Sequence, residues 1–261
     1  MTNEKRNEPE HRRAVCDPPE LKLKTLGITV TLLTPRETAV LALSDFTGKR
    51  LILNHNLHSA YLHGKDDKFR QLYENADWTV IDGIPILWAA SVAAHKVLPS
   101  NYRFSSTDWI DELSHVQCPA RIFVFGATLT SNCAAIEKLR TKLPNCAVSG
   151  VHGYVNDQLA IEMISDFRPN LVVVGLGMPR QEYFLLKNWA RLPSATYATV
   201  GGAIDYIAGT TRLAPRWLGY FGAEWLWRLL NEPRRLAFRY LVEPWLLAWQ
   251  ILVRSVHSVR T

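Results

Sequence analysis

The sequence contains few of the short motifs that identify a reactive or metal-binding site. Its four cysteines, Cys16, Cys118, Cys133 and Cys146, are scattered through 261 residues without a CxxC pair. They predict reduced, mostly buried thiols rather than a disulfide framework or a zinc site. HExxH, EF-hand, Walker A and nucleophile-elbow patterns are also missing, so the sequence gives no support to zinc-protease, calcium-sensor, P-loop or serine-hydrolase chemistry.

Long apolar runs are missing as well. The nearest approach to one, Tyr240–Val253, is shorter than a bilayer span and is interrupted by Glu243 and Pro244. Residues 1–20 are charged and contain prolines in place of the apolar centre of a signal peptide. We therefore expect a disordered lead-in over residues 1–20, no export and no transmembrane helix.

The net charge of +6 is concentrated at the C-terminal end. From Arg212 onward the chain has eight arginines, no lysine and three acids, together with five of its nine tryptophans. We therefore divide the chain into the lead-in at 1–20, a body at 21–211 and a helical Arg/Trp-rich appendage at 212–261. The appendage could be a helical cap, a nucleic-acid-binding segment or a helix lying on a membrane surface. Its composition favours the membrane surface, and the body shows no known nucleic-acid module.

Short apolar runs alternate with amphipathic segments along the body. This alternation is typical of a mostly parallel sheet with helices on both faces, so we predict a Rossmann-like α/β fold. The predicted strands are Leu26–Leu33, Arg50–Asn54, Trp78–Ile81, Arg121–Phe125, Ala147–Val151, Leu171–Val174 and Thr196–Val200. The predicted helices are Arg36–Leu43, Ser59–Asn75, Ile84–Ala94, Ser131–Leu143, Gln158–Phe167 and Pro179–Ala190.

Small or polar residues follow strand after strand. They are Asn54-His55-Asn56, Asp82-Gly83, Gly126-Ala127-Thr128, Gly175-Leu-Gly177 and Gly201-Gly202. Each alone is typical of an ordinary turn, but together they predict a crevice at the carboxyl edge of the sheet, where such folds bind ligands. Asp82 suits a general base at that edge and equally suits a helix N-cap. The helix that opens after Phe125 offers amide groups suited to a phosphate.

Six stretches occur together in the order found in one family. They are Asp82-Gly-Ile-Pro85, Arg103-Phe-Ser-Ser-Thr-Asp108, Val174-Gly-Leu-Gly-Met-Pro-Arg-Gln-Glu182, Gly201-Gly-Ala-Ile-Asp-Tyr206, Arg212-Leu-Ala-Pro215 and Glu224-Trp…Arg228-Leu…Glu232-Pro-Arg-Arg235. From about Leu26 to Tyr240 the chain resembles the WecG/TagA/CpsF glycosyltransferase family. The resemblance implies an inverting hexosyltransferase that moves a sugar from a UDP-sugar to a saccharide on undecaprenyl pyrophosphate. It also implies a reaction without metal or cofactor, in agreement with the missing Asp-x-Asp pair.

The resemblance also implies roles for single residues. Asp82 is the expected catalytic base, which takes the proton of the acceptor hydroxyl. Gln181 is expected to contact the sugar through its amide. Arg228 and Arg235 of the appendage are expected to reach the pyrophosphate, where guanidinium groups would stabilise the departing UDP.

The remaining expected site residues bind the donor. Arg103 is expected to hold phosphate or donor, and Asn54 and Asn56 to contact the donor from the second strand edge. The glycines expected to let backbone approach the nucleotide closely are Gly126, Gly175 and Gly177.

The donor sugar is predicted from a departure from the family pattern. The family often has Thr-x-Asn at the second strand edge, whereas this chain reads Asn54-His55-Asn56-Leu57-His58, and Ser105-Ser106 replaces a frequent Thr-Gly. The variant is closer to the xanthan-type exopolysaccharide glucosyltransferases, so glucose is the predicted sugar. Alternatives are N-acetylmannosamine or its uronic acid, as in teichoic-acid or enterobacterial-antigen synthesis, or a non-enzymatic nucleotide- or nucleic-acid-binding protein. His55 and His58 could contact the acceptor or be simple loop histidines.

The expected partners follow from this interpretation. They are a UDP-sugar, a lipid-linked saccharide acceptor and the membrane surface, with no nucleic acid. The protein is expected to be cytoplasmic and peripheral on the inner face of the cell membrane. Homo-oligomer formation is left open.

Overall fold

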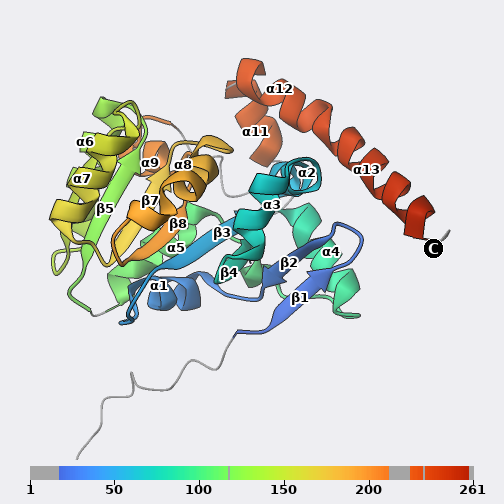
Figure 1. Ribbon diagram of the computed structural model, residues 1–261, viewed down its shortest axis with the longest axis horizontal. Coiled ribbons are helices and arrows are strands. Elements are labelled where there is room, and N and C mark those ends of the chain that lie inside the picture. Colours follow the sequence, from blue (N-terminus) through green and yellow to red (C-terminus); the bar gives the residue numbers. More distant parts are fainter. Residues whose placement is uncertain (1–17, 117, 212–223, 232, 259–261) are drawn as a thin grey trace, which may run out of the picture.

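A six-stranded sheet forms the centre of the molecule (Figure 1). The computed structural model describes residues 18–116, 118–211, 224–231 and 233–258. Every neighbouring strand pair of this sheet is parallel, and the order is β4-β3-β8-β7-β5-β6. The strands are β3 (Arg50–His55), β4 (Trp78–Ile81), β5 (Arg121–Gly126), β6 (Ala147–Val151), β7 (Leu171–Gly175) and β8 (Thr196–Thr199). The predicted α/β fold is confirmed.

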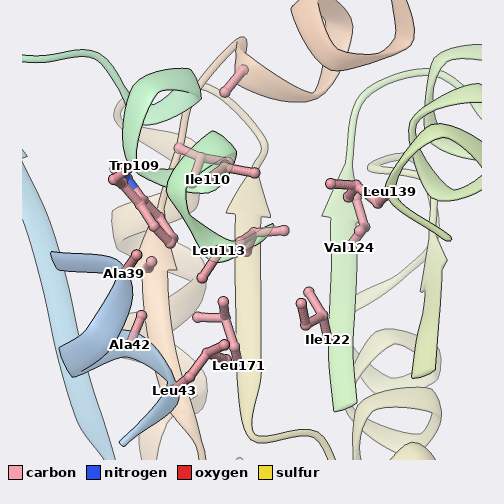
Figure 2. Packing of buried hydrophobic residues seen from close by; sticks show 14 of the residues in the cluster. Ala39, Ala42, Leu43, Trp109, Ile110, Leu113, Ile122, Val124, Leu139 and Leu171 are labelled. Carbon is pink, nitrogen blue, oxygen red and sulfur yellow. The ribbon is translucent and has the colours of Figure 1, made fainter. Parts of the chain in front are cut away.

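Alternate residues of each strand enter two separate cores, because successive side chains of a strand point to opposite faces. In β5, Ile122 and Val124 join the first core, whereas Phe123 and Phe125 join the second. The first core is covered by α1 (Pro35–Leu43), α5 (Ser106–Glu112), α6 (Leu129–Lys142) and α9 (Ala203–Ala208). The second is covered by α3 (Asp67–Glu74), α7 (Asp157–Phe167) and α8 (Arg180–Asn188). Figure 2 shows part of the first core, with Trp109 of α5 near Ala39 of α1 and with Ile122 and Val124 on β5.

A third core lies beside β4. It joins α2 (Leu57–Lys65), α4 (Ile84–Ala93) and a separate antiparallel hairpin, β1 (Glu20–Leu23) and β2 (Ile28–Thr31). Thr79 of β4 fastens the hairpin, since its hydroxyl donates to the Thr29 carbonyl at 2.6 Å. The predicted strand at 26–33 therefore exists, but it pairs with β1 and not with the main sheet. Short 3₁₀ helices stand at η2 (Ser100–Tyr102), η3 (Leu113–His115) and η4 (Trp189–Arg191).

Three C-terminal helices lie together on one side of the sheet domain, above α2 (Figure 1). They are α11 (Glu224–Asn231), α12 (Pro233–Leu241) and α13 (Glu243–Ser258). The inner face of α13 packs along α2 and buries Leu247 in the third core. Within the described parts of the chain, none of the helices combines the length and apolar character needed to cross a bilayer. Residues 1–17 of the expected lead-in lie outside the described residues.

Candidate active site

The carboxyl ends of the six parallel strands meet at one edge of the sheet, where ligands bind in folds of this class. Most of the predicted site residues lie at these ends or just after them: Asn54 and Asn56 at β3, Asp82 at β4, Gly126 at β5, Gly175 and Gly177 at β7. Two surface hollows elsewhere on the described part of the chain, at Asp157 and at Arg121, contain none of the predicted site residues. The sheet edge is therefore the candidate site.

Asp82 lies directly after β4, and Asn56 orients its carboxylate. The Asn56 side-chain amide donates to Asp82 Oδ2 at 3.3 Å, while the Asp82 backbone amide donates to the His55 carbonyl at 2.8 Å. Asn56 is itself fixed as the N-cap of α2, where Oδ1 accepts from the Ser59 backbone amide at 3.0 Å. The helix-cap interpretation of Asp82 is wrong, because Gly83 caps α4 without any side-chain hydrogen bond. The carboxylate thus faces Asn56 and is not occupied in capping α4.

Arg103 lies beside Asp82 because its segment pairs with the end of β4. Ile81 and Arg103 form a parallel bridge, and the Phe104 amide donates to the Ile81 carbonyl at 3.2 Å. Arg103 is half-buried. The structure therefore brings together Asn56, Asp82 and Arg103, two of them adjoining β4 and one following β3.

Asn54 and Gln181 make contacts inside the protein. Asn54 Oδ1 accepts from the Thr199 hydroxyl at 3.1 Å, which links β3 to β8. Gln181 is only 1% exposed, and its Oε1 accepts from the Gly201 backbone amide at 3.0 Å. Both amides connect strand ends at this edge of the sheet. Their expected contacts with donor or sugar stay predictions.

The three predicted glycines differ in what surrounds them. A Cβ on Gly126 would lie 2.3 Å from the Gly175 carbonyl oxygen, and one on Gly175 would lie 2.5 Å from Ile204 Cδ1. Gly177 has a φ of +76° and open space around the position of a Cβ. Packing of the chain on itself therefore requires glycine at 126 and 175. Their approach to a nucleotide stays a prediction.

Buried ionisable groups lie behind this edge. The His55 ring is enclosed 4.5 Å from the Tyr73 ring, and its Nδ1 lies 3.1 Å from Ser59 Oγ. Burial, with the nearby His63, lowers the pKa of His55 to about 3, so it is neutral and is not an exposed acceptor contact. Burial raises the pKa of Glu182 to about 7. Sequence reasoning gave Glu182 no role, although it belongs to the motif that contains Gln181.

The C-terminal helices are joined to this region by an ion pair. His58 Nδ1 lies 2.6 Å from Glu243 Oε2, so the start of α13 is fastened to the start of α2. Arg228 and Arg235 belong to α11 and α12, but their side chains lie outside the described residues. Among the described residues no group of three or more His, Cys, Asp or Glu could hold a metal ion. Metal independence stays a prediction.

Comparisons with known proteins agree with this arrangement. The family model of the glycosyl transferase WecG/TagA/CpsF family matches residues 23–260. A Bacillus spizizenii N-acetylglucosaminyldiphosphoundecaprenol N-acetyl-beta-D-mannosaminyltransferase is 29% identical over 175 residues, which cover 66% of this chain and 67% of that protein. A Staphylococcus aureus protein of the same name is 28% identical over 185 residues, or 69% of this chain and 68% of that one. The chain therefore belongs to the WecG/TagA/CpsF glycosyltransferase family and is a glycosyltransferase.

Proposed function

We propose that the protein transfers N-acetylmannosamine from a UDP-sugar to a saccharide carried on undecaprenyl diphosphate, with inversion at the anomeric carbon. The observation that carries the proposal is the Asp82 carboxylate, held by Asn56 at 3.3 Å on the carboxyl edge of a family-typical sheet. The sugar and the lipid carrier come from the names of the similar proteins of B. spizizenii and S. aureus.

Asp82 acts as the general base in this proposal. Its carboxylate takes the proton of an acceptor hydroxyl while that oxygen forms a bond to the anomeric carbon and the bond to UDP breaks. Asn56 donates to Oδ2 and so keeps the carboxylate directed. The arginine beside it, Arg103, supplies positive charge for phosphate, and Arg228 and Arg235 are the proposed contacts of the departing UDP or the lipid pyrophosphate. No metal is needed where guanidinium groups offset that charge.

Glucose, the sugar predicted from Asn54-His55-Asn56, becomes the second candidate. The structure gives His55 a buried position and Asn54 a bond to Thr199, so this stretch supports the fold of the site as much as it could select a sugar. The two related transferases carry N-acetylmannosaminyl in their names. The names therefore favour N-acetylmannosamine over glucose.

Peripheral attachment to the inner face of the membrane is part of the proposal. Trp245 and Trp249 of α13 are 75% and 68% exposed, on the side opposite the buried Leu247. Indole rings favour the headgroup level of a bilayer, and arginines favour anionic lipid. A surface of this composition brings the crevice to a lipid-linked acceptor.

Substitution of Asp82 tests the chemistry. UDP release is measured with a UDP-sugar and an acceptor on a polyprenyl diphosphate. We expect Asp82→Asn to lose about 10²- to 10⁴-fold in kcat, the usual effect of a lost general base. Asp67→Asn changes a carboxylate in an exposed ion pair of α3 and is the matched control, with near-native turnover expected. Turnover by folded Asp82→Asn equal to that of the control would remove Asp82 as base.

A donor screen tests the sugar. UDP-N-acetylmannosamine, its uronic acid and UDP-glucose are compared at equal concentration on acceptors carrying one N-acetylglucosamine or a longer saccharide. The highest kcat/KM is expected with UDP-N-acetylmannosamine. A clear preference for UDP-glucose would favour the exopolysaccharide interpretation. The same assay with EDTA is expected to show undiminished turnover, and loss of activity would contradict the metal-free mechanism.

A further inference from the structure

Glu182 is a buried carboxyl group with one oxygen left without a partner. It lies in the first turn of α8 and is 0% exposed. Oε1 accepts from the Gln181 side-chain amide at 2.8 Å, but Oε2 has no hydrogen-bond partner among the described residues. Buried polar atoms are nearly always paired, so an unpaired carboxyl oxygen behind a candidate active site calls for a functional explanation.

A positive charge from the C-terminal helices acts on this carboxyl group. Arg239 of α12 lowers the pKa of both Glu182 and Tyr73, in each case against a larger rise caused by burial. Three residues earlier, Leu236 is buried, whereas Arg234 and Phe238 are exposed. Leu236 and Arg239, three positions apart, therefore lie on the same side of α12, away from the exposed Arg234.

Hydrogen bonds near Glu182 reach the carboxyl ends of β8 and β3. The Gln181 side chain joins the carboxyl group to the loop after β8. Its amide nitrogen donates to Glu182, and its Oε1 accepts from the Gly201 backbone amide at 3.0 Å. Tyr73 donates its hydroxyl to the Asn54 carbonyl at 3.0 Å, at the end of β3. The Glu182 carboxyl group is therefore connected to the loop after β8 through two hydrogen bonds.

We infer that Glu182 is a positioning residue that links docking of the C-terminal helices to the geometry of the active site. Its carboxylate attracts Arg239 and holds α12 against the sheet domain, and through Gln181 it fixes the loop at Gly201. It touches no reacting atom, since it is fully buried. The ionisable groups that act with it are Tyr73 on α3, Tyr183 beside it on α8 and Arg239 on α12.

The linkage includes a proton. Without Arg239, burial favours the neutral carboxylic acid, and with Arg239 close by, the carboxylate is favoured. When α12 leaves, Glu182 takes a proton from water, and when α12 docks, it releases that proton. Docking of the helices that carry Arg228 and Arg235 is therefore tighter at pH values where Glu182 is ionised.

A double-mutant cycle tests the inference, which rests on the proposed function for its kinetic readout. Glu182→Gln, Arg239→Gln and the double variant are compared in kcat and in KM for the lipid-linked acceptor, at saturating UDP-sugar. Each single change is expected to raise the acceptor KM by on the order of ten-fold, and the double variant no further, because each change removes the same interaction. Arg234→Gln, on the exposed face of α12, is the control, and its effect should multiply independently with that of Glu182→Gln.

A pH profile and a thermal measurement complete the test. In the wild-type protein the acceptor KM is expected to rise on acidification, because protonated Glu182 no longer attracts Arg239. Arg239→Gln has already lost this interaction, so its acceptor KM should show no such rise. The same cycle followed by thermal unfolding needs no activity. If Glu182→Gln folds poorly, the pH profile of the acceptor KM in Arg239→Gln alone still tests the link.

Independent effects of Glu182→Gln and Arg239→Gln, with the acceptor KM of Arg239→Gln keeping the wild-type pH profile, would overturn the inference. Coupling in thermal unfolding alongside a wild-type protein that releases no UDP from any acceptor would instead overturn the proposed function. In that case Glu182 would still be linked to Arg239.

Discussion

At the scale of single residues, His55 shows how the site depends on a neutral buried group. Its ring is enclosed by Ser59, His63 and Tyr73 at the end of β3, one residue before Asn56. An imidazolium ion in this position would lack water and lie beside a second histidine. The neutral form is therefore required for the native packing behind the crevice.

Acid is expected to destabilise the protein through His55. The unfolded residue binds a proton near pH 6.5, but the folded one only near pH 3. The free energy of unfolding is therefore free of this penalty above pH 6.5. It falls as the pH decreases toward 3, and the loss through His55 is about 2 kcal/mol at pH 5. Urea unfolding at pH 7 and pH 5 measures this loss, which should be smaller in His55→Gln. The exposed His115→Gln should keep the wild-type loss, and an equal loss in all three proteins would contradict the prediction.

Adding a single methyl group should lower the free energy of unfolding by different amounts at Gly126 and at Gly177. Gly126 has a φ of +141° and no room for a Cβ, whereas Gly177 has a φ of +76° and open space. We expect Gly126→Ala to destabilise the protein by about 3 kcal/mol or more through backbone overlap with Gly175, and Gly177→Ala by about 1 kcal/mol of conformational strain. Chemical denaturation of both variants gives the comparison. Equal losses would show that packing is not what requires glycine at 126.

At the scale of elements, the sequence predicted local structure better than pairing. The strands Trp78–Ile81 and Ala147–Val151 have the predicted bounds, because both are short apolar runs between turns. The predicted helix Ser59–Asn75 is divided into α2 and α3, since Asp66 accepts from the backbone amides of Lys68 and Phe69 and starts a new helix. The hairpin partner β1 was missed because its four residues are half polar and pair outside the main sheet.

The same distinction applies to the site. Asp82 and Asn56 could be placed from the ends of their strands, because parallel strands share one carboxyl edge. Glu182, Tyr73 and Arg239 could not be grouped, since they come from α8, α3 and α12 and meet only through tertiary packing. The hydrophobic periodicity of a helix predicts which of its residues point into the protein. It does not predict which distant helix those residues will face.

The contact between His58 and Glu243 adds to the apolar packing of α13 on α2. His58 and Glu243 have side chains only 13% and 7% exposed, so water screens the pair weakly. We expect Glu243→Ala to cost about 3 kcal/mol, because it leaves His58 without its buried partner, and to lower the Tm by roughly 6–12 °C. Glu137→Ala removes an exposed partner of Arg140, with side chains 51% and 72% exposed, and should cost under about 1 kcal/mol. Equal effects in a thermal melt would show that α13 is held by apolar packing alone.

At the scale of the whole molecule, the C-terminal helices combine exposed apolar side chains with an arginine-rich sequence. The Arg/Trp-rich segment supplies three helices that expose tryptophan and leucine side chains, while Leu236, Glu243 and Leu247 face inward. The same helices thus have one side fixed to the sheet domain and one side free to meet a bilayer. The proposed transfer to a lipid-linked saccharide requires both contacts at once.

Vesicle binding provides a direct test of this surface. Trp245→Ser with Trp249→Ser on α13 should weaken co-sedimentation with anionic phosphatidylglycerol vesicles by at least about ten-fold, because each indole loses apolar contact with the interface. Trp88→Ser is the matched control, since Trp88 is 67% exposed and belongs to α4 and not to the C-terminal helices. Higher salt should weaken binding of all the proteins, because it screens arginine from anionic lipid. A larger loss in the Trp88 variant than in the double variant would place the membrane contact on α4 instead of α13.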